Sequence, residues 1–232
     1  MARYKSVGQM VKAGDYEALK EFFTTTETSV LNAIKEVNEK GTRDIDSLLQ
    51  FAIAAKGERQ LDIVELLIKY GANINMTDKN GATLLMVAAQ NNNLETMRFL
   101  MQNPNIELNK IDEIFKKATH YAVMGNAVEA FDLLYQTGQF DINEKTMLAE
   151  ETYLHFATQQ GSVEIAYRLM ELGIDPTVEN AVEGSLAAAY VPEVEDNEDG
   201  SPGADADKYN KLFEDLENYR EKFKKSNNAF DF

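Results

Sequence analysis

Residues 83–93 read TLLMVAAQNNN, and residues 94–109 continue as LETMRFLMQNPNIELN. The first segment runs through apolar residues to the small pair Ala88–Ala89, and the second carries apolar residues at helical spacing. Together they predict a short helix, a turn at Asn92 and a longer helix. The same order begins again at Ser47, Lys117 and Thr152. The four openings are 36, 34 and 35 residues apart, which is the regularity of a repeat protein.

Each copy contains turn residues at two fixed places. A Gly or Asn turn separates the two predicted helices, at Gly57, Asn92, Gly125 and Gly161. The copy then closes with GANIN (71–75) or a variant of it, in which Gly71 can adopt the left-handed conformation that ends a helix.

These segments resemble the ankyrin repeat, whose period is about 33 residues. The positions that match the family pattern best are Asp78, Gly81, Thr83, Leu85, Ala88, Ala89 and 71–75. Four copies in register cover residues 45–178. The resemblance implies an all-α ankyrin-repeat solenoid of stacked helix pairs with hairpin loops between them.

The array is expected to extend beyond the four clear copies. Residues 1–45 form a degenerate N-terminal cap, with a helix pair turning at Gly14–Asp15 and a further helix over 29–39. The repeats occupy 46–190, and GSLAAAY at 184–190 resembles the first helix of a fifth, partial copy.

The C-terminal part has two predicted segments. Residues 191–207 are an acidic flexible loop, because 192–207 hold seven Asp or Glu and no Lys or Arg. Residues 208–232 are an amphipathic helix and tail, in which Asp207 is expected to cap the helix. The apolar stripe of that helix consists of Tyr209, Leu212, Phe213, Leu216, Tyr219 and Phe223. The helix either folds back to cap the last repeat, which the unfinished fifth copy favours, or docks in a partner's groove.

Composition narrows the class of partner. The formal net charge is -16, which repels nucleic acid and anionic lipid and favours a protein partner with a basic patch. No apolar run of membrane-spanning or signal-peptide length occurs, so we expect a cytoplasmic protein that does not enter a membrane. We also expect the protein to be a monomer. The absence of cysteine excludes disulfides, thiolate metal sites and a cysteine nucleophile.

No pattern for catalysis, a metal or a cofactor emerges. His120 and His155 both fall on the family's histidine position, where the resemblance implies hydrogen bonds that tie neighbouring hairpins together. The acidic loop alternates Glu195, Asn197 and Asp199 as a calcium loop does, but the position of the final bidentate Glu is Ala206. The chain is therefore predicted not to be an enzyme.

The resemblance places partner binding on the hairpin tips and the exposed ends of the first helices. The predicted tip positions are Met76, Asp78, Lys79, Asn80, Ala82, Lys110, Glu113, Ile114, Lys116, Glu144, Lys145 and Glu150. The predicted helix-end positions are Lys56, Gln90, Asn91, Met124, Gln159 and Gln160. For Met86 and Met124 both packing in the core and contact with a partner are considered.

We expect a protein–protein interaction module that acts as an adaptor, inhibitor or scaffold. The alternative is an ankyrin-repeat effector of an intracellular bacterium, which is exported by a Glu-rich C-terminal signal and binds a host protein. Glu214, Glu217 and Glu221 are similar to such a signal. A catalytic site in the ends is disfavoured, because 1–45 and 179–232 are short for a catalytic domain.

Overall fold

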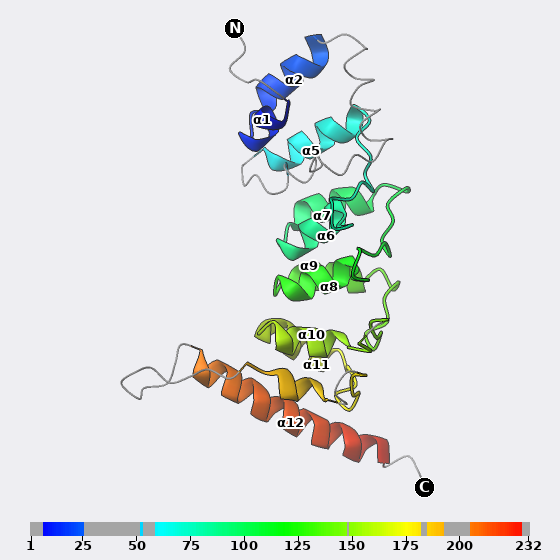
Figure 1. Ribbon diagram of the computed structural model, residues 1–232, viewed down its shortest axis with the longest axis vertical. Helices are drawn as coiled ribbons and strands as arrows, with labels where there is room; N and C mark the ends of the chain where they lie inside the picture. The colour runs from blue at the N-terminus through cyan, green and yellow to red at the C-terminus, as the bar shows by residue number, and fades with distance from the viewer. Residues whose placement is uncertain are drawn as a thin grey trace, which may run out of the picture. The chain divides into compact units, whose positions relative to one another are not determined.

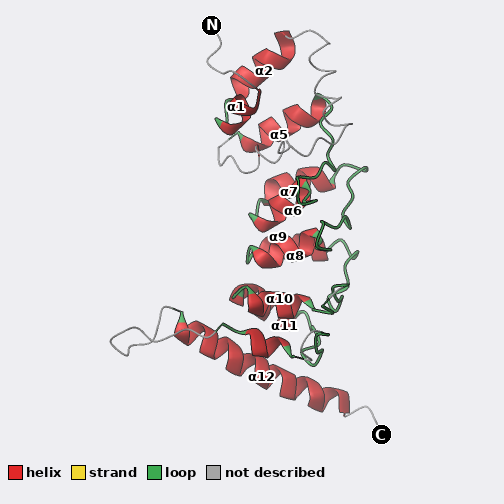
Figure 2. Cartoon of the chain, viewed as in Figure 1, coloured by secondary structure: helices red, strands yellow, loops and turns green. Residues whose placement is uncertain are grey.

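The computed structural model describes residues 7–25, 52, 59–147, 149–181, 185–192 and 205–228. The described residues form α-helices, one 3-10 helix, turns and hairpins, and contain no β-strand beyond two isolated bridges (Figure 1, Figure 2). This confirms the predicted all-α class. The contacts divide the chain into two units. Unit 1 contains residues 1–89 and 93–118, and unit 2 contains residues 90–92 and 119–232.

Unit 1 begins with the predicted N-terminal helix pair. Its helices are α1 (Val7–Lys12), α2 (Tyr16–Thr25), α5 (Gln60–Lys69), α6 (Leu84–Gln90, whose last residue belongs to unit 2) and α7 (Leu94–Met101). The turn between α1 and α2 contains Gly14 at φ +66°, a left-handed conformation that glycine adopts without strain. The predicted helix over 29–39 and most of the first helix over 47–57 lie outside the described residues.

Unit 1 is held together by apolar side chains of successive helices. Leu19 and Phe23 of α2 are buried, and the Phe23 ring stacks on Tyr70 with ring centroids 4.7 Å apart. Ile63 of α5 and Met97 of α7 are also buried. The second helices therefore pack on one another, α2 with α5 and α5 with α7, through faces whose apolar residues recur at helical spacing.

Unit 2 repeats the same order and then ends differently. Its elements are α8 (Ala118–Met124, of which Ala118 belongs to unit 1), α9 (Val128–Tyr135), α10 (Tyr153–Gln159), α11 (Val163–Glu171), η1 (Ala187–Tyr190) and α12 (Ala206–Asn228). The helix expected over 184–190 is reduced to the four-residue 3-10 helix η1.

The predicted turns at Asn92, Gly125 and Gly161 are confirmed, and Gly57 lies outside the described residues. Asn92, Gly161 and Gly71 adopt positive φ values of 53°, 65° and 95°. In the copy that contains Gly125, the left-handed residue of the turn is the next one, Asn126 at φ 50°. A Cβ atom on Gly125 would lie 2.0 Å from the carbonyl oxygen of Gln90. Glycine is therefore required there because two backbone segments approach closely, and not because of backbone conformation.

Helix α12 packs against α11 and η1 (Figure 1). Its residues Leu212 and Leu216 are buried. The Tyr219 hydroxyl donates a hydrogen bond of 2.9 Å to the backbone oxygen of Ile174, and Tyr167 donates one of 2.8 Å to Asp215. These contacts confirm the capping helix that completes the end of the array.

Two details of the C-terminal prediction were wrong. Helix α12 begins at Ala206, so Asp207 lies within its first turn and does not precede it as a cap. Phe213, which was assigned to the apolar stripe, is 46% exposed. The acidic segment 193–204 lies outside the described residues, and so does the calcium-like alternation within it.

Candidate protein-binding surfaces

Two hairpins of unit 1 are built by one scheme of hydrogen bonds. The Oδ1 atom of Asp78 accepts the backbone N–H groups of Asn80 and Ala82, both at 2.8 Å. In the next hairpin, Oδ1 of Asp112 accepts those of Ile114 and Lys116 at 2.9 and 2.8 Å. The Asp78 carboxylate, predicted to contact a partner, therefore has a structural role in shaping its turn.

The tips of these two hairpins are joined through their backbones. The N–H group of Glu113 donates a hydrogen bond of 3.1 Å to the carbonyl oxygen of Asn80. A Cβ atom on Gly81 would lie 2.8 Å from the same nitrogen, so the contact requires glycine. Lys79, Asn80 and Glu113 are exposed. The backbone thus fixes the tips, while these three predicted binding side chains remain at the surface. Ala82, also predicted at a tip, is buried.

Lys110 has a more internal position than the sequence suggested. Its ammonium group donates a hydrogen bond of 3.2 Å to the backbone oxygen of Asn75 and lies 3.2 Å from Oε2 of Glu107. The Asn75 side chain in turn binds the backbone of Asn105 and Glu107 at 2.6 and 3.0 Å. Lys110 therefore helps to join successive loops. Met76 and Lys116 are half-buried.

Unit 2 brings together the ends of three first helices. Asn91 and Gln160 are exposed, whereas Gln90, Met124 and Gln159 are half-buried. The close approach of Gly125 to Gln90 places the ends of α6 and α8 side by side. The Gln159 amide donates a hydrogen bond of 2.6 Å to Oε1 of Glu151. Apart from Met124, these predicted positions carry uncharged amide side chains that can donate and accept hydrogen bonds. Met86 is buried in the core, and Lys56 lies outside the described residues.

The hairpins of unit 2 repeat the joined-tip arrangement. The N–H group of Ala181 donates a hydrogen bond of 2.8 Å to the carbonyl oxygen of Ala149. The Lys145 ammonium pairs with the Glu150 carboxylate at 3.1 Å, and Glu144 is half-buried beside the Tyr153 hydroxyl at 3.4 Å. Met147 of this hairpin, which the sequence prediction omitted, is 75% exposed.

Both histidines are buried. The Nδ1 atom of His155 accepts the Thr152 N–H group at 3.2 Å, so the proton is on Nε2, which donates to the Ser185 carbonyl oxygen at 3.0 Å. This bond ties α10 to the following hairpin, as the resemblance implied. The His120 ring lies 4.7 Å from that of Tyr153 and 5.2 Å from that of Phe156, measured between centroids.

Residues 8–112 match the family model of ankyrin repeats, with three copies. The structure continues the same helix–turn–helix order after residue 112, through α8 to α11. Residues 8–112 are thus ankyrin repeats.

Several curated proteins resemble this chain over part of its length. The chicken (Gallus gallus) nuclear factor NF-kappa-B p105 subunit is 30% identical over 112 residues, which are 47% of this chain and 11% of that protein. A putative ankyrin repeat protein of Rickettsia felis is 34% identical over 86 residues, 37% of this chain and 28% of the relative. The I-Kappa-B like protein G1 of Microplitis demolitor bracovirus is 32% identical over 95 residues, which are 38% of this chain and 54% of that protein.

The matched part of the chain thus spans from about a tenth to just over half of these relatives' lengths. The family and the relatives support a protein–protein interaction module, since ankyrin stacks build extended binding surfaces. Among the residues that the structure describes, no group of three or more His, Asp or Glu is arranged to hold a metal ion, and no helix is long and apolar enough to cross a membrane.

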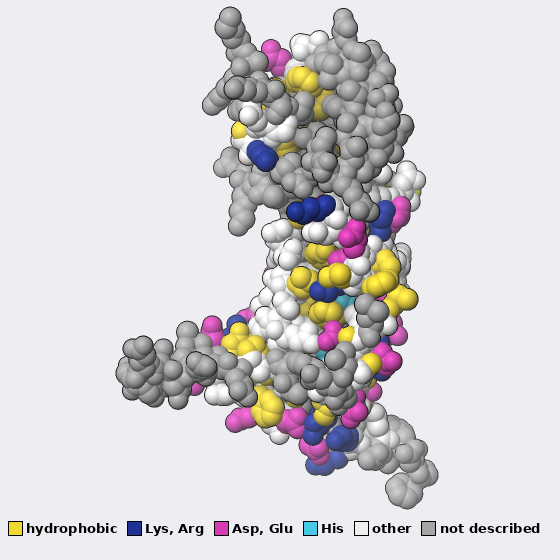
Figure 3. All heavy atoms as spheres, viewed as in Figure 1, with side chains coloured by type: hydrophobic (Ala, Val, Ile, Leu, Met, Phe, Trp, Pro, Cys, Tyr) yellow, Lys and Arg dark blue, Asp and Glu magenta, His cyan; other side chains and the backbone are white. Residues whose placement is uncertain are grey.

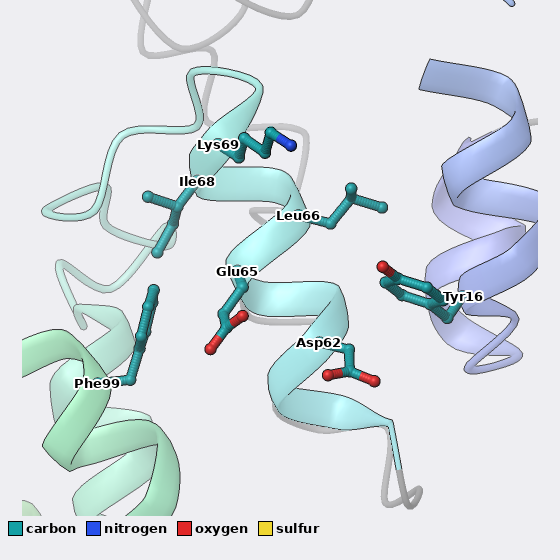
Figure 4. Close-up of a pocket in the computed structure, with 7 residues that line it drawn as sticks. All are labelled: Tyr16, Asp62, Glu65, Leu66, Ile68, Lys69 and Phe99. Carbon is teal, nitrogen blue, oxygen red and sulfur yellow. The ribbon is translucent and has the colours of Figure 1, made fainter. Parts of the chain in front are cut away.

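A surface pocket of about 430 Å³ lies on the second helices of unit 1 (Figure 4). Tyr16 and Phe99 lie on opposite sides of α5, and Glu65 lies between them. Asp62, which also lines the pocket, pairs with Arg59 at 2.6 Å. The sequence did not predict this pocket, and its carboxylates lack the paired environment that acid–base catalysis needs.

Proposed function

We propose that this chain is an adaptor, inhibitor or scaffold that holds a partner protein on its hairpin tips and the ends of its first helices. One observation carries the proposal. The backbone bond between Glu113 and Asn80 fixes two tips, yet the side chains of Lys79, Asn80 and Glu113 are exposed. A loop whose backbone is already fixed loses little backbone freedom on binding, which favours affinity and specificity. Fold and recognition thus depend on different atoms of the same loops.

The charge of the chain supports a partner with a basic surface. A formal net charge of -16 attracts a basic protein over long range and raises the association rate at low salt. The exposed carboxylate of Glu113 is suited to contact such a surface at short range. We therefore expect the association rate to fall as ionic strength rises.

The test combines affinity capture with a matched pair of charge reversals. Proteins captured from the native organism are purified, and their affinity for the chain is measured with wild type, Glu113→Lys and Glu21→Lys. Both substitutions change the net charge equally, but Glu21 is an exposed residue of α2, away from the hairpins. We expect Glu113→Lys to weaken binding about tenfold, in line with an energetically important charge at an interface, and Glu21→Lys to change it much less.

Two outcomes contradict the proposal. A wild-type chain that binds no purified protein saturably excludes an interaction module. Equal affinities for wild type and Glu113→Lys exclude this hairpin tip as a binding surface. Circular dichroism of each variant checks that the fold is retained.

A further inference from the structure

The two hairpins of unit 1 share their backbone geometry but differ in residue type. Asp78 and Asp112 occupy equivalent places, because each accepts two N–H groups of its own turn. Gly81 and Phe115 are then also equivalent, since each N–H group bonds the carbonyl oxygen of its aspartate, at 3.1 and 3.2 Å. Their φ angles are +81° and +64°. The second hairpin therefore holds a phenylalanine in a conformation that its neighbour gives to glycine.

This choice of residue disfavours folding. At positive φ, the Cβ atom of an L-residue crowds the backbone, and a bulky residue there is an outlier. Glycine at Phe115 would satisfy the same turn, as Gly81 shows. A strained residue at a position where glycine would satisfy the turn points to a role beyond the turn itself.

The same hairpin exposes two further apolar side chains. Ile114, equivalent to the exposed polar Asn80, is 61% exposed, and Ile111 is 42% exposed. Phe115 follows Ile114 in the sequence and is half-buried. We name Ile111, Ile114 and Phe115 the apolar tip. Figure 3 shows hydrophobic side chains at the surface of the molecule among charged ones.

We propose that the apolar tip inserts into an apolar pocket, rimmed by basic residues, on the partner protein. The proposal rests on the protein-binding function above and names its central contact. Buried apolar anchors at the centre of an interface supply most of the binding energy, and surrounding polar contacts exclude water. Glu113 lies between Ile111 and Ile114 in sequence and is exposed, so its carboxylate meets the basic rim.

The net charge of the chain distinguishes this partner from two others that an apolar tip could bind, a second copy of the chain and a lipid bilayer. A second copy of the chain also has a formal net charge of -16, so two copies repel each other. A bilayer with anionic lipids repels the chain in the same way. A basic rim around an apolar pocket complements the apolar side chains of the tip, the exposed Glu113 carboxylate among them and the negative net charge of the chain.

The first experiment uses the full chain and gives the tip the residues of its neighbour. The double substitution Ile114→Asn and Phe115→Gly reproduces the Asn80–Gly81 pair, so the turn is expected to form and thermal stability to be kept or raised. Affinity for the purified partner is expected to fall at least tenfold, as for loss of an interface anchor. The control Phe213→Gln removes a 46% exposed apolar side chain from α12 and is expected to leave the affinity unchanged.

The second experiment identifies what surrounds the tip. p-Benzoylphenylalanine is introduced at Ile114, and its photochemical crosslinks to the purified partner are mapped by mass spectrometry. Attachment to apolar residues flanked by Lys or Arg supports the proposal. The single substitution Ile114→Asn is measured alongside, since a 61% exposed side chain contributes little to folding.

The outcomes distinguish the inference from the function on which it rests. If wild type and the double variant bind the partner equally, the apolar tip is not the anchor, while the binding function stands. If wild type binds no protein, both proposals are wrong. Binding of wild type alone to phosphatidylcholine–phosphatidylserine vesicles, or concentration-dependent dimerisation lost in the double variant, assigns the tip to a membrane or a second copy and overturns the proposal.

Discussion

The side chain of Asn126 caps a helix of the following repeat: its Oδ1 atom accepts a hydrogen bond of 3.2 Å from the N–H group of Ile165. Ile165 is the third residue of α11, and its N–H group is one of those that have no partner within the helix. Asn92 does the same for Ala130 of α9 at 3.0 Å. Successive repeats are therefore joined by helix caps supplied from the neighbouring turn, in addition to their shared apolar core.

Substitution of Asn126 tests this cap. Asn126→Gly removes the side chain but keeps a residue that accepts φ 50°, so we expect a loss of about 1 kcal/mol, typical of a helix cap. Asn126→Ala loses the cap and also strains the turn, which adds about 1 kcal/mol. Urea unfolding of the full chain measures both. Equal stability of wild type and the glycine variant would show that the cap contributes nothing.

Gly125 and Gly138 form a matched pair for a test of close packing. A Cβ atom on Gly125 would lie 2.0 Å from Gln90 O, whereas one on Gly138 would meet nothing within 4 Å. Gly125→Ala forces two backbone segments apart, and we expect a cost of about 3 kcal/mol or more. Gly138→Ala meets only the strain of φ +67°, about 1 to 2 kcal/mol. Thermal melting followed by circular dichroism gives the order, and a reversed order would contradict the close approach.

Leu212 and Phe213 test whether α12 stabilises the array. Leu212 is completely buried against the last repeat, and Phe213, the next residue, is 46% exposed. We expect Leu212→Ala to cost about 2 to 4 kcal/mol by leaving a cavity, and Phe213→Ala to cost less than about 1 kcal/mol. Hydrogen exchange of α11 and α12 measures the loss locally. Equal protection in both variants would show that α12 docks weakly and does not act as a cap.

Much of the fold was predictable because the sequence patterns that specify it are local and recur in each copy. Apolar periodicity and turn residues predicted the helices α6 to α11, and the amphipathic pattern predicted α12. The structure departs from the sequence prediction where contacts between segments far apart in the sequence determine the environment of a residue. Only the approach of Gln90 explains Gly125, and helical periodicity alone does not show that Phe213 faces outward while Leu212 is buried.

The candidate surface was less predictable than the fold. A family pattern gives the loops but not the function of each side chain, so Asp78 and Lys110 were assigned to a partner although their polar groups hold the loops together. Comparison of DKNGA (78–82) with DEIFK (112–116) shows Phe115 in place of Gly81. That comparison is available from the sequence, but its meaning depends on the φ angle of Phe115.

His155 makes the stability of unit 2 depend on pH. Burial lowers its pKa below the ordinary 6.5, and the hydrogen bond to Ser185 O opposes this in part. Protonation of Nδ1 also removes the acceptor for the Thr152 N–H group. Between the folded pKa and 6.5, the unfolded chain binds more protons than the folded one. The stabilisation is therefore complete above pH 6.5 and is lost as pH falls through the folded pKa.

The measurement is chemical unfolding between about pH 7.5 and about pH 5, which stays above the range of the carboxylates whose pKa is lowered. The pKa of Glu129 is lowered by a hydrogen bond from its own backbone N–H group and by one from Asn92, and the pKa of Glu164 is lowered by a hydrogen bond from Asn126. Wild type is compared with the variant His155→Gln, whose side chain can keep the capping interaction with Thr152 but does not titrate. His120 is present in wild type and variant alike, so its contribution cancels in the difference. We expect wild type to lose stability relative to His155→Gln as the pH falls below 6.5. Parallel pH profiles would show that folding does not change the pKa of His155.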